Sequence, residues 1–305
     1  MSTNANTDHH ELEPVSTASE FVHVVEVGPR DGLQNEASPV STADKVAFVN
    51  DLSEAGLPTV EVTSFVNPAA VPQLADANDV LAGIDRKPGV RYLVLVPNER
   101  GLDRAIQAGA DSIAVFAAAT EGFSQANLRA SVSDAFIRFE SVARRAINLG
   151  IYVRGYVSVA LTCPFDGPVE PESAAKVAQR LFDIGCSEVA LADTIGTASP
   201  GQVEELLSSA LRTMPADRLA LHLHDTSGQA LSNVEVGLAA GIRTFDAAAG
   251  GLGGCPFAPG APGNLSTESL IDFLHGAGYA TGVDVSKVRS AAVRIKRLLG
   301  YAGVA

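Results

Sequence analysis

The chain has 305 residues, of which 46% are hydrophobic, and a formal net charge of −13 at pH 7. An acidic protein repels phosphate backbones, so we expect no nucleic acid among its partners. Its three cysteines, Cys163, Cys186 and Cys255, do not make a disulfide framework and favour a reducing compartment such as the cytoplasm. No apolar run reaches the length of about 18 residues that a membrane span needs, so we expect no membrane helix.

The first 20 residues read MSTNANTDHHELEPVSTASE and contain no apolar run and no Lys or Arg. They therefore fit neither a secretory signal nor a mitochondrial transit peptide. We expect residues 1–20 to form a short disordered tail, followed by one domain over residues 21–305, because the sequence contains no linker that would separate a second domain.

From residue 21 onward, short apolar runs rich in β-branched residues alternate with longer helical patterns. Eight runs are predicted strands: Phe21–Val27, Thr59–Thr63, Val90–Val96, Ser112–Ala117, Ile151–Val159, Glu188–Leu191, Leu219–His224 and Arg243–Ala247. Helical patterns lie between them: Thr42–Ala55, Glu99–Ala108, Ser131–Asn148, Pro171–Ile184, Gly201–Arg212 and Gly228–Ala240. Ser41 and Ser131 are suitable N-caps. Five helices are followed by a glycine of the kind that ends a helix in a left-handed conformation: Gly56, Gly109, Gly150, Gly185 and Gly241.

This alternation of strands and helices indicates parallel strand pairing. Eight units favour closure into a (β/α)8 barrel, the TIM barrel, over an open doubly wound sheet, and no G-x-G-x-x-G motif follows the first strand. We expect an α/β fold with a single barrel domain and an additional basic helix over Asp284–Tyr301.

Two histidines lie two residues apart at the end of the seventh predicted strand, in LALHLHDT. His222 and His224 therefore point to one face, which is the barrel interior if Leu221 and Leu223 face the helices. A single inward histidine is most often a core residue, whereas two at this spacing favour metal ligands. Active sites of such barrels lie at the carboxyl ends of the strands, so we expect a metal site here.

Charged residues follow other strands at the same end of the barrel. Arg30 and Asp31 follow the first strand in a Gly/Pro turn, where a surface ion pair is the plain alternative to a catalytic role. Asp193 ends the sixth strand in LADTIG, and Glu61 lies within the second strand. An inward carboxylate must be paired or bind a metal, so Glu61 either pairs with Arg30 or Arg154 or orients a metal ligand.

A glycine- and proline-rich segment, Gly250–Asn264, follows the eighth strand. It is too rich in these residues for regular structure and suits a loop that covers a ligand. Cys255 lies in its middle, where a chemical role is favoured over an incidental thiol. Together, an aspartate, two histidines and an amide oxygen favour Mg²⁺ or Mn²⁺, with zinc as an alternative.

Several segments resemble the 3-hydroxy-3-methylglutaryl-CoA lyases, which belong to a wider family of metal-dependent barrels that includes isopropylmalate and homocitrate synthases. They are EVGPRDGLQNE (Glu26–Glu36), TSFVNP (Thr63–Pro68), VRGYVS (Val153–Ser158), DTIG (Asp193–Gly196), HLHDTSGQAL (His222–Leu231) and GLGGCPFAPGAPGN (Gly251–Asn264). The likeness runs from Val24 to the end of the barrel. The first and last motifs are the most specific, and DTIG is shared with the synthases.

This resemblance implies roles for the residues already singled out. It implies four metal ligands: Asp31, His222, His224 and Asn264. Arg30 is then expected to stabilise an enolate oxygen and Glu61 to hold the site in shape. Asp193 and His222 are expected to orient the substrate or to transfer protons, and Cys255 to act as a general acid or as part of a closing loop.

The reaction that the resemblance implies is a retro-aldol cleavage of (S)-3-hydroxy-3-methylglutaryl-CoA to acetyl-CoA and acetoacetate, a step of leucine degradation and ketone-body formation. The expected partners are an acyl-CoA thioester and a second copy of the chain in a homodimer. A lyase for a longer branched homologue is one alternative. A condensing synthase is another, although the chain ends right after the barrel, where synthases carry a further region. A non-catalytic barrel would be expected to have lost some of these site residues.

Overall fold

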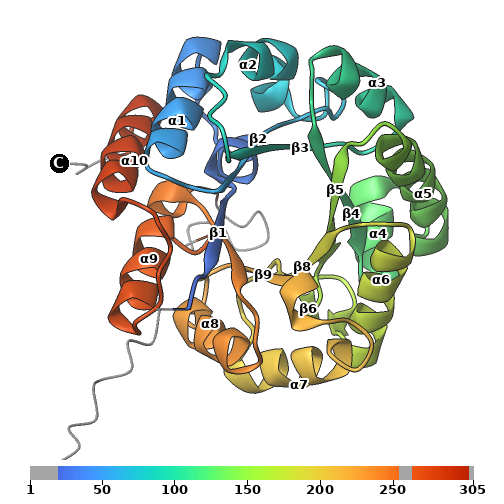
Figure 1. Ribbon diagram of the computed structural model, residues 1–305. Coiled ribbons are helices and arrows are strands. Elements are labelled where there is room, and N and C mark those ends of the chain that lie inside the picture. Colours follow the sequence, from blue (N-terminus) through green and yellow to red (C-terminus); the bar gives the residue numbers. More distant parts are fainter. Residues whose placement is uncertain (1–19, 254–262, 302–305) are drawn as a thin grey trace, which may run out of the picture.

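The computed structural model describes residues 20–253 and 263–301, so most of the predicted tail lies outside the described residues. Eight parallel strands close into a barrel in the order β1-β10-β9-β8-β5-β4-β3-β2 (Figure 1). They are β1 (His23–Glu26), β2 (Thr59–Ser64), β3 (Arg91–Leu95), β4 (Ser112–Ala118), β5 (Tyr152–Ser158), β8 (Glu188–Asp193), β9 (Leu219–Leu223) and β10 (Thr244–Ala247). The predicted barrel is confirmed, and each predicted strand end differs from the observed one by at most two residues.

Helices surround the barrel because each strand is buried on both faces and leads into a helix that returns the chain to the next strand. They are α1 (Thr42–Glu54), α2 (Ala77–Gly83), α3 (Glu99–Gln107), α5 (Val132–Asn148), α6 (Pro171–Asp183), α7 (Pro200–Ala210), α8 (Ala230–Ala239) and α9 (Thr267–Gly276). The additional C-terminal helix is confirmed as α10 (Val285–Leu299), which packs beside α1.

The predicted helix ends are also confirmed. The hydroxyl of Ser41 accepts a hydrogen bond from the backbone N–H of Asp44 at 3.1 Å, and that of Ser131 accepts one from Asp134 at 3.0 Å. Positive φ angles are found at all five predicted glycines: Gly56, Gly109, Gly150, Gly185 and Gly241. Local sequence therefore determines where these helices stop.

Several further elements were not predicted. The helices α2 and α9 complete the outer ring. Three others follow strands at their carboxyl ends: a π-helical turn at Gly28–Gly32, the helix α4 (Glu121–Leu128), and a hairpin of β6 (Thr162–Cys163) and β7 (Gly167–Pro168). These additions therefore build the end of the barrel at which the active site is expected.

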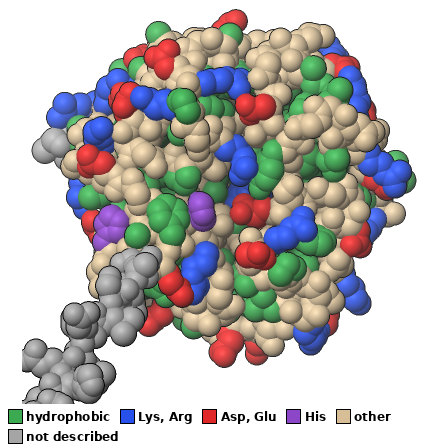
Figure 2. All heavy atoms as spheres, in the orientation of Figure 1, with side chains coloured by type: hydrophobic (Ala, Val, Ile, Leu, Met, Phe, Trp, Pro, Cys, Tyr) green, Lys and Arg blue, Asp and Glu red, His purple; other side chains and the backbone are tan. Residues whose placement is uncertain are grey.

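Within the described part of the chain, no helix is long and apolar enough to cross a bilayer. On the face shown in Figure 2, acidic and basic side chains are interspersed among neutral ones. This mixed pattern differs from the basic stripe typical of nucleic-acid-binding surfaces.

Two helix ends form a matched pair for testing the barrel connections. Gly56 and Gly109 have φ angles of 89° and 77°. A methyl group on Gly56 would lie 2.7 Å from the carbonyl oxygen of Gly282, whereas one on Gly109 would have no atom within 4 Å. We expect Gly109→Ala to lower the free energy of unfolding by about 1–2 kcal/mol, the cost of a left-handed residue, and Gly56→Ala to lower it further. Urea unfolding measures both changes, and equal losses would contradict the role of the close approach.

Candidate active site

The two histidines of β9 lie on one side of that strand, as their spacing predicts. His222 is within β9 and His224 follows its last residue, Leu223. Both imidazoles are buried, and their ring centroids lie 5.3 Å apart. Leu221 and Leu223 belong instead to the hydrophobic core. The two side chains therefore face the carboxyl end of the barrel interior together.

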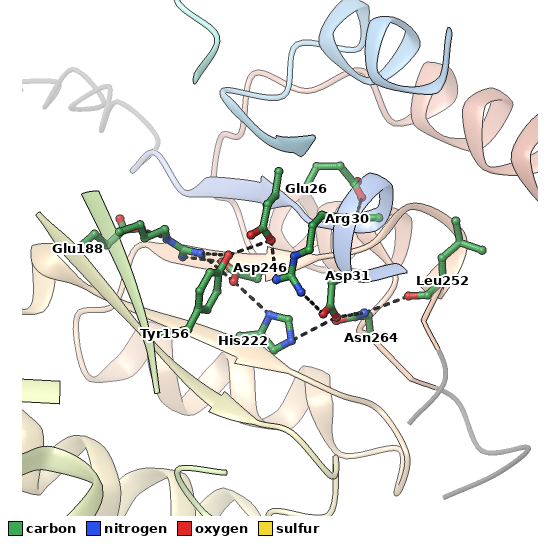
Figure 3. A network of polar contacts seen from close by, with 12 residues as sticks. Glu26, Arg30, Asp31, Tyr156, Glu188, His222, Asp246, Leu252 and Asn264 are labelled. Carbon is green, nitrogen blue, oxygen red and sulfur yellow. Dashed lines mark hydrogen bonds and ion pairs between the residues drawn. The ribbon is translucent and has the colours of Figure 1, made fainter. Parts of the chain in front are cut away.

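Asp31 reaches the same place from the π-helical turn after β1. The backbone N–H groups of Arg30, Asp31 and Gly32 all donate to the carbonyl oxygen of Val27, at 3.2, 2.7 and 3.2 Å. This tight turn aims the Asp31 carboxylate across the barrel mouth. One oxygen of Asp31 lies 3.9 Å from Nε2 of His222 (Figure 3).

These three residues form a donor set that fits a divalent cation. One ligand atom from each of Asp31, His222 and His224 lies within 4.8 Å of the others. In addition, Nδ1 of His224 is buried and has no hydrogen-bond partner among the described residues. A carboxylate and two imidazoles suit a divalent cation that keeps open positions for further oxygen ligands.

The charges of the cluster also suit a cation. Burial opposes ionisation of Asp31, but the positive charge of Arg30 and the nearby imidazoles hold the pKa of Asp31 well below its usual range. Burial, followed by the proximity of His222, lowers the pKa of His224 to about 4. Asp31 is therefore ionised and His224 neutral near pH 7, the forms in which these side chains bind metals.

Asn264 stands beside this cluster at the end of the glycine-rich segment. Its backbone pairs with His224, and its side-chain nitrogen donates to Oδ2 of Asp31 at 2.8 Å and to the carbonyl oxygen of Leu252 at 3.0 Å. The structure thus brings the fourth predicted ligand next to the other three, with its amide nitrogen toward Asp31.

Arg30 lies next to Asp31 and is held from below. Its Nη1 donates to Asp31 at 2.5 Å, and its Nη2 donates to the buried Oε2 of Glu61 at 2.7 Å. The hydroxyl of Tyr156 also donates to Oε2 of Glu61, at 3.2 Å. Of the two arginines considered for Glu61, Arg30 is therefore the partner, and Glu61 fixes the direction of the guanidinium.

A cavity of about 300 Å³ opens above these groups. Its polar lining comes from Arg30, Asp31, His222 and His224, together with neighbouring side chains. Its apolar wall consists of Val66, Val71, Leu95, Phe116 and Phe123. The cavity therefore combines a charged floor with a wall that suits an aliphatic group.

Another predicted site residue, Asp193, does not line this cavity. The carboxylate of Asp193 accepts hydrogen bonds from the backbone N–H groups of Gly196 and Ala198, at 3.0 and 2.9 Å. It therefore shapes its own loop, while its neighbours Ala192 and Thr194 line the cavity. Cys255 lies outside the described residues.

The sequence reasoning missed Asp246 as a functional residue. Asp246 is buried in β10 and contacts Nδ1 of His222 at 3.1 Å. Arg154 pairs with Asp246 and also donates to the hydroxyl of Tyr156, at 2.7 Å. The available signal was a lone aspartate in the apolar strand TFDA, together with Arg154 and Tyr156 two residues apart on β5.

Most of the chain is similar in sequence to proteins of a known family. The profile of the HMGL-like family matches residues 21–295. The chain belongs to this family. It is 50% identical to the cytoplasmic 3-hydroxy-3-methylglutaryl-CoA lyase of Rattus norvegicus over 286 residues, which are 92% of this chain and 83% of the relative.

Solved structures of HMGL-like proteins match the fold. The HMG-CoA lyase from Brucella melitensis has a TM-score of 0.91 and 50% identity, covering 92% of this chain and 100% of that one. An HMG-CoA lyase from Acinetobacter baumannii, in complex with coenzyme A and 3-methylmalate, has a TM-score of 0.87 and 36% identity, with 92% of each chain covered.

A second buried carboxyl group, Glu26, lies near the site but outside the metal cluster. Its Oε1 accepts from the backbone N–H groups of Gly28 and Ala249 at 2.7 and 2.9 Å, and its Oε2 is 2.7 Å from the hydroxyl of Thr267. Burial raises the pKa of Glu26 to about 8, although these hydrogen bonds favour the ionised form.

The raised pKa of Glu26 predicts how the stability of the fold depends on pH. Because the folded state keeps this proton while the unfolded chain loses it near pH 4.5, stability should fall as the pH rises toward about 8. The slope is at most about 1.4 kcal/mol per pH unit. Glu26→Gln preserves the acceptor for both backbone N–H groups and cannot ionise, so it should lose less stability over this interval. Urea unfolding at several pH values measures the difference, and parallel curves for the two proteins would refute it.

Proposed function

We propose that this protein cleaves 3-hydroxy-3-methylglutaryl-CoA to acetyl-CoA and acetoacetate with the help of a divalent cation. The observation that carries the proposal is the convergence of Asp31, His222 and His224 next to Arg30 at the floor of one cavity. Relatives about half identical to this chain are named as lyases of this substrate, and a structural neighbour was solved with coenzyme A.

The ion is proposed to be Mg²⁺ or Mn²⁺, held by Asp31, His222, His224 and the amide oxygen of Asn264. The mixed nitrogen and oxygen donors suit either ion. A bound divalent cation supplies positive charge against the substrate oxygen that loses its proton.

The bond changes follow from the chemistry of the substrate, which carries a tertiary hydroxyl two carbons from a thioester carbonyl. A base, namely Asp31, His222 or a water molecule, takes the hydroxyl proton. The released electron pair forms the ketone of acetoacetate, the carbon–carbon bond breaks, and its electrons form the enolate of acetyl-CoA. Cys255 or His222 then gives a proton to the enolate carbon.

Arg30 is proposed to stabilise the enolate oxygen. Its guanidinium is fixed on two sides, by Asp31 and by Glu61, so it needs no rearrangement as negative charge develops. Preorganised donors of this kind contribute several kcal/mol to catalysis. Asp193 is proposed to act on the substrate indirectly, through the loop that carries Thr194 into the cavity.

We infer that this protein takes part in leucine degradation and ketone-body formation, the routes that use this reaction. We also infer that it forms a homodimer and lies in the cytoplasm. Cys163 and Cys186 are buried free thiols, as expected in a reducing compartment. We further propose that residues 21–305 act as one catalytic domain preceded by a tail.

A longer branched substrate is a second candidate because the cavity has an apolar wall. Val66, Val71 and Phe123 are among the residues that an extended acyl chain would contact. Comparing kcat/KM for 3-hydroxy-3-methylglutaryl-CoA with that for its longer homologue separates the two substrates.

The direct test is an assay for acetoacetate. We expect the purified protein to release acetoacetate from 3-hydroxy-3-methylglutaryl-CoA in the presence of Mg²⁺ or Mn²⁺. EDTA should abolish the release and excess Mg²⁺ should restore it, because the chelator removes the positive charge that the bound cation supplies against the substrate hydroxyl oxygen. Cleavage that is unaffected by chelation would remove the metal from the proposal, and no cleavage in either metal would overturn the function.

The role of Arg30 can be tested separately. We expect Arg30→Gln to lower kcat about 10²–10³-fold, as for loss of an oxyanion-stabilising donor. Arg100→Gln is a matched control, because Arg100 is an exposed arginine on α3 that lines a different hollow. Circular dichroism would verify that both proteins fold. Similar kcat values for the two variants would show that Arg30 does not act on the reaction.

A further inference from the structure

A buried ion pair lies on the floor side of the proposed metal cluster. Arg154 of β5 is 1% exposed, and Asp246 of β10 is also 1% exposed. Nη2 of Arg154 donates to Oδ1 of Asp246 at 2.7 Å, and Nη1 donates to Oδ2 at 3.0 Å. This two-pronged contact holds the carboxylate plane in one orientation. The remaining Nε of Arg154 donates to Glu188 at 2.7 Å.

The same carboxylate contacts a proposed metal ligand. Oδ2 of Asp246 lies 3.1 Å from Nδ1 of His222. The strand register explains the contact, because Asp246 and His222 are direct partners in the pairing of β10 with β9. Both side chains thus leave neighbouring strands at the same level and on the same side, as Figure 3 shows.

The contact determines which nitrogen of His222 is presented to the cavity. A carboxylate engaged by Arg154 accepts hydrogen bonds and donates none, so the hydrogen lies on Nδ1 of His222. The lone pair of Nε2 is then directed toward Asp31, 3.9 Å away. His224 differs, since its Nδ1 has no partner among the residues that the structure describes. Of the two imidazoles, His222 is therefore the one whose direction the protein fixes.

We propose that Asp246 is the positioning residue for His222: it fixes the tautomer and direction of this ligand, and Arg154 fixes Asp246 in turn. The inference rests on the proposed function. Asp246 and Arg154 are absent from the lining of the cavity, so they act through His222 and Tyr156 and not on the substrate. Partners of this kind contribute strongly to metal affinity in other sites.

The first experiment compares Asp246→Asn with Glu188→Gln. Each removes one carboxylate charge from Arg154, but only Asp246 contacts His222. Mn²⁺ binding is measured by electron paramagnetic resonance on the folded full-length proteins. We expect Asp246→Asn to raise the Kd for Mn²⁺ about 10–100-fold, and Glu188→Gln to keep it close to the wild-type value. Much of the lost kcat should return at saturating Mn²⁺. Equal weakening in both variants would reduce Asp246 to a structural role and overturn the proposal.

The second experiment uses the unaltered protein and so remains decisive if Asp246→Asn does not fold. Labelling histidine with ¹⁵N distinguishes the two ring nitrogens by their chemical shifts, and His222→Gln identifies the signals of His222. In the metal-free protein, where no cation occupies Nε2, we expect a hydrogen of His222 on Nδ1. A hydrogen on Nε2 and none on Nδ1 would overturn the inference. Failure of wild-type protein to bind Mn²⁺ and to release acetoacetate would instead overturn the proposed function, while the position of this hydrogen would still be measurable.

Discussion

The site depends on pairing charges that the barrel interior would otherwise exclude. Arg30 and Arg154 are both nearly inaccessible to solvent, and an isolated charge in such a place is costly. Each is compensated by carboxylates from other strands, Arg30 by Glu61 and Arg154 by Asp246. Tyr156 joins the two pairs, because it donates to Glu61 and accepts from Arg154. The proposed catalytic groups thus rest on one connected polar layer, which comes from β2, β5, β10 and the turn after β1.

Barrel closure is what brings the two ends of this layer together. Asp31 follows β1 and His222 lies in β9, yet only β10 separates these two strands because β1 pairs with β10. In an open sheet that ran in chain order from β1 to β10, these two strands would lie at opposite edges. Asp31 and His222 can therefore meet only because the barrel closes.

The sequence predicted the structural features that depend on local residue patterns. Strand runs, Ser41 as a cap and Gly56 as a helix end depend on nearby residues and were confirmed. The spacing of His222 and His224 likewise predicted their common direction. The short helix α4 and the π-helical turn were missed because their stability depends on tertiary packing. Asp246 was missed for a related reason. The sequence does not show which residue lies beside this aspartate, and only the register of β10 and β9 places it opposite His222. Asp193 illustrates the converse, since a carboxylate at a strand end can instead bind its own loop.

Both ends of the glycine-rich segment after β10 are anchored, and one of them contacts the proposed metal cluster. At one end, Glu268 accepts from the backbone N–H of Gly250 at 2.8 Å, and Glu26 accepts from that of Ala249. At the other, Asn264 pairs with the backbone of His224 and donates to Asp31. A change in the position of Asn264 therefore alters the surroundings of two proposed ligands at once. Because Asn264 belongs both to this anchor and to the proposed ligand set, a cation bound there would also hold this end of the segment in place.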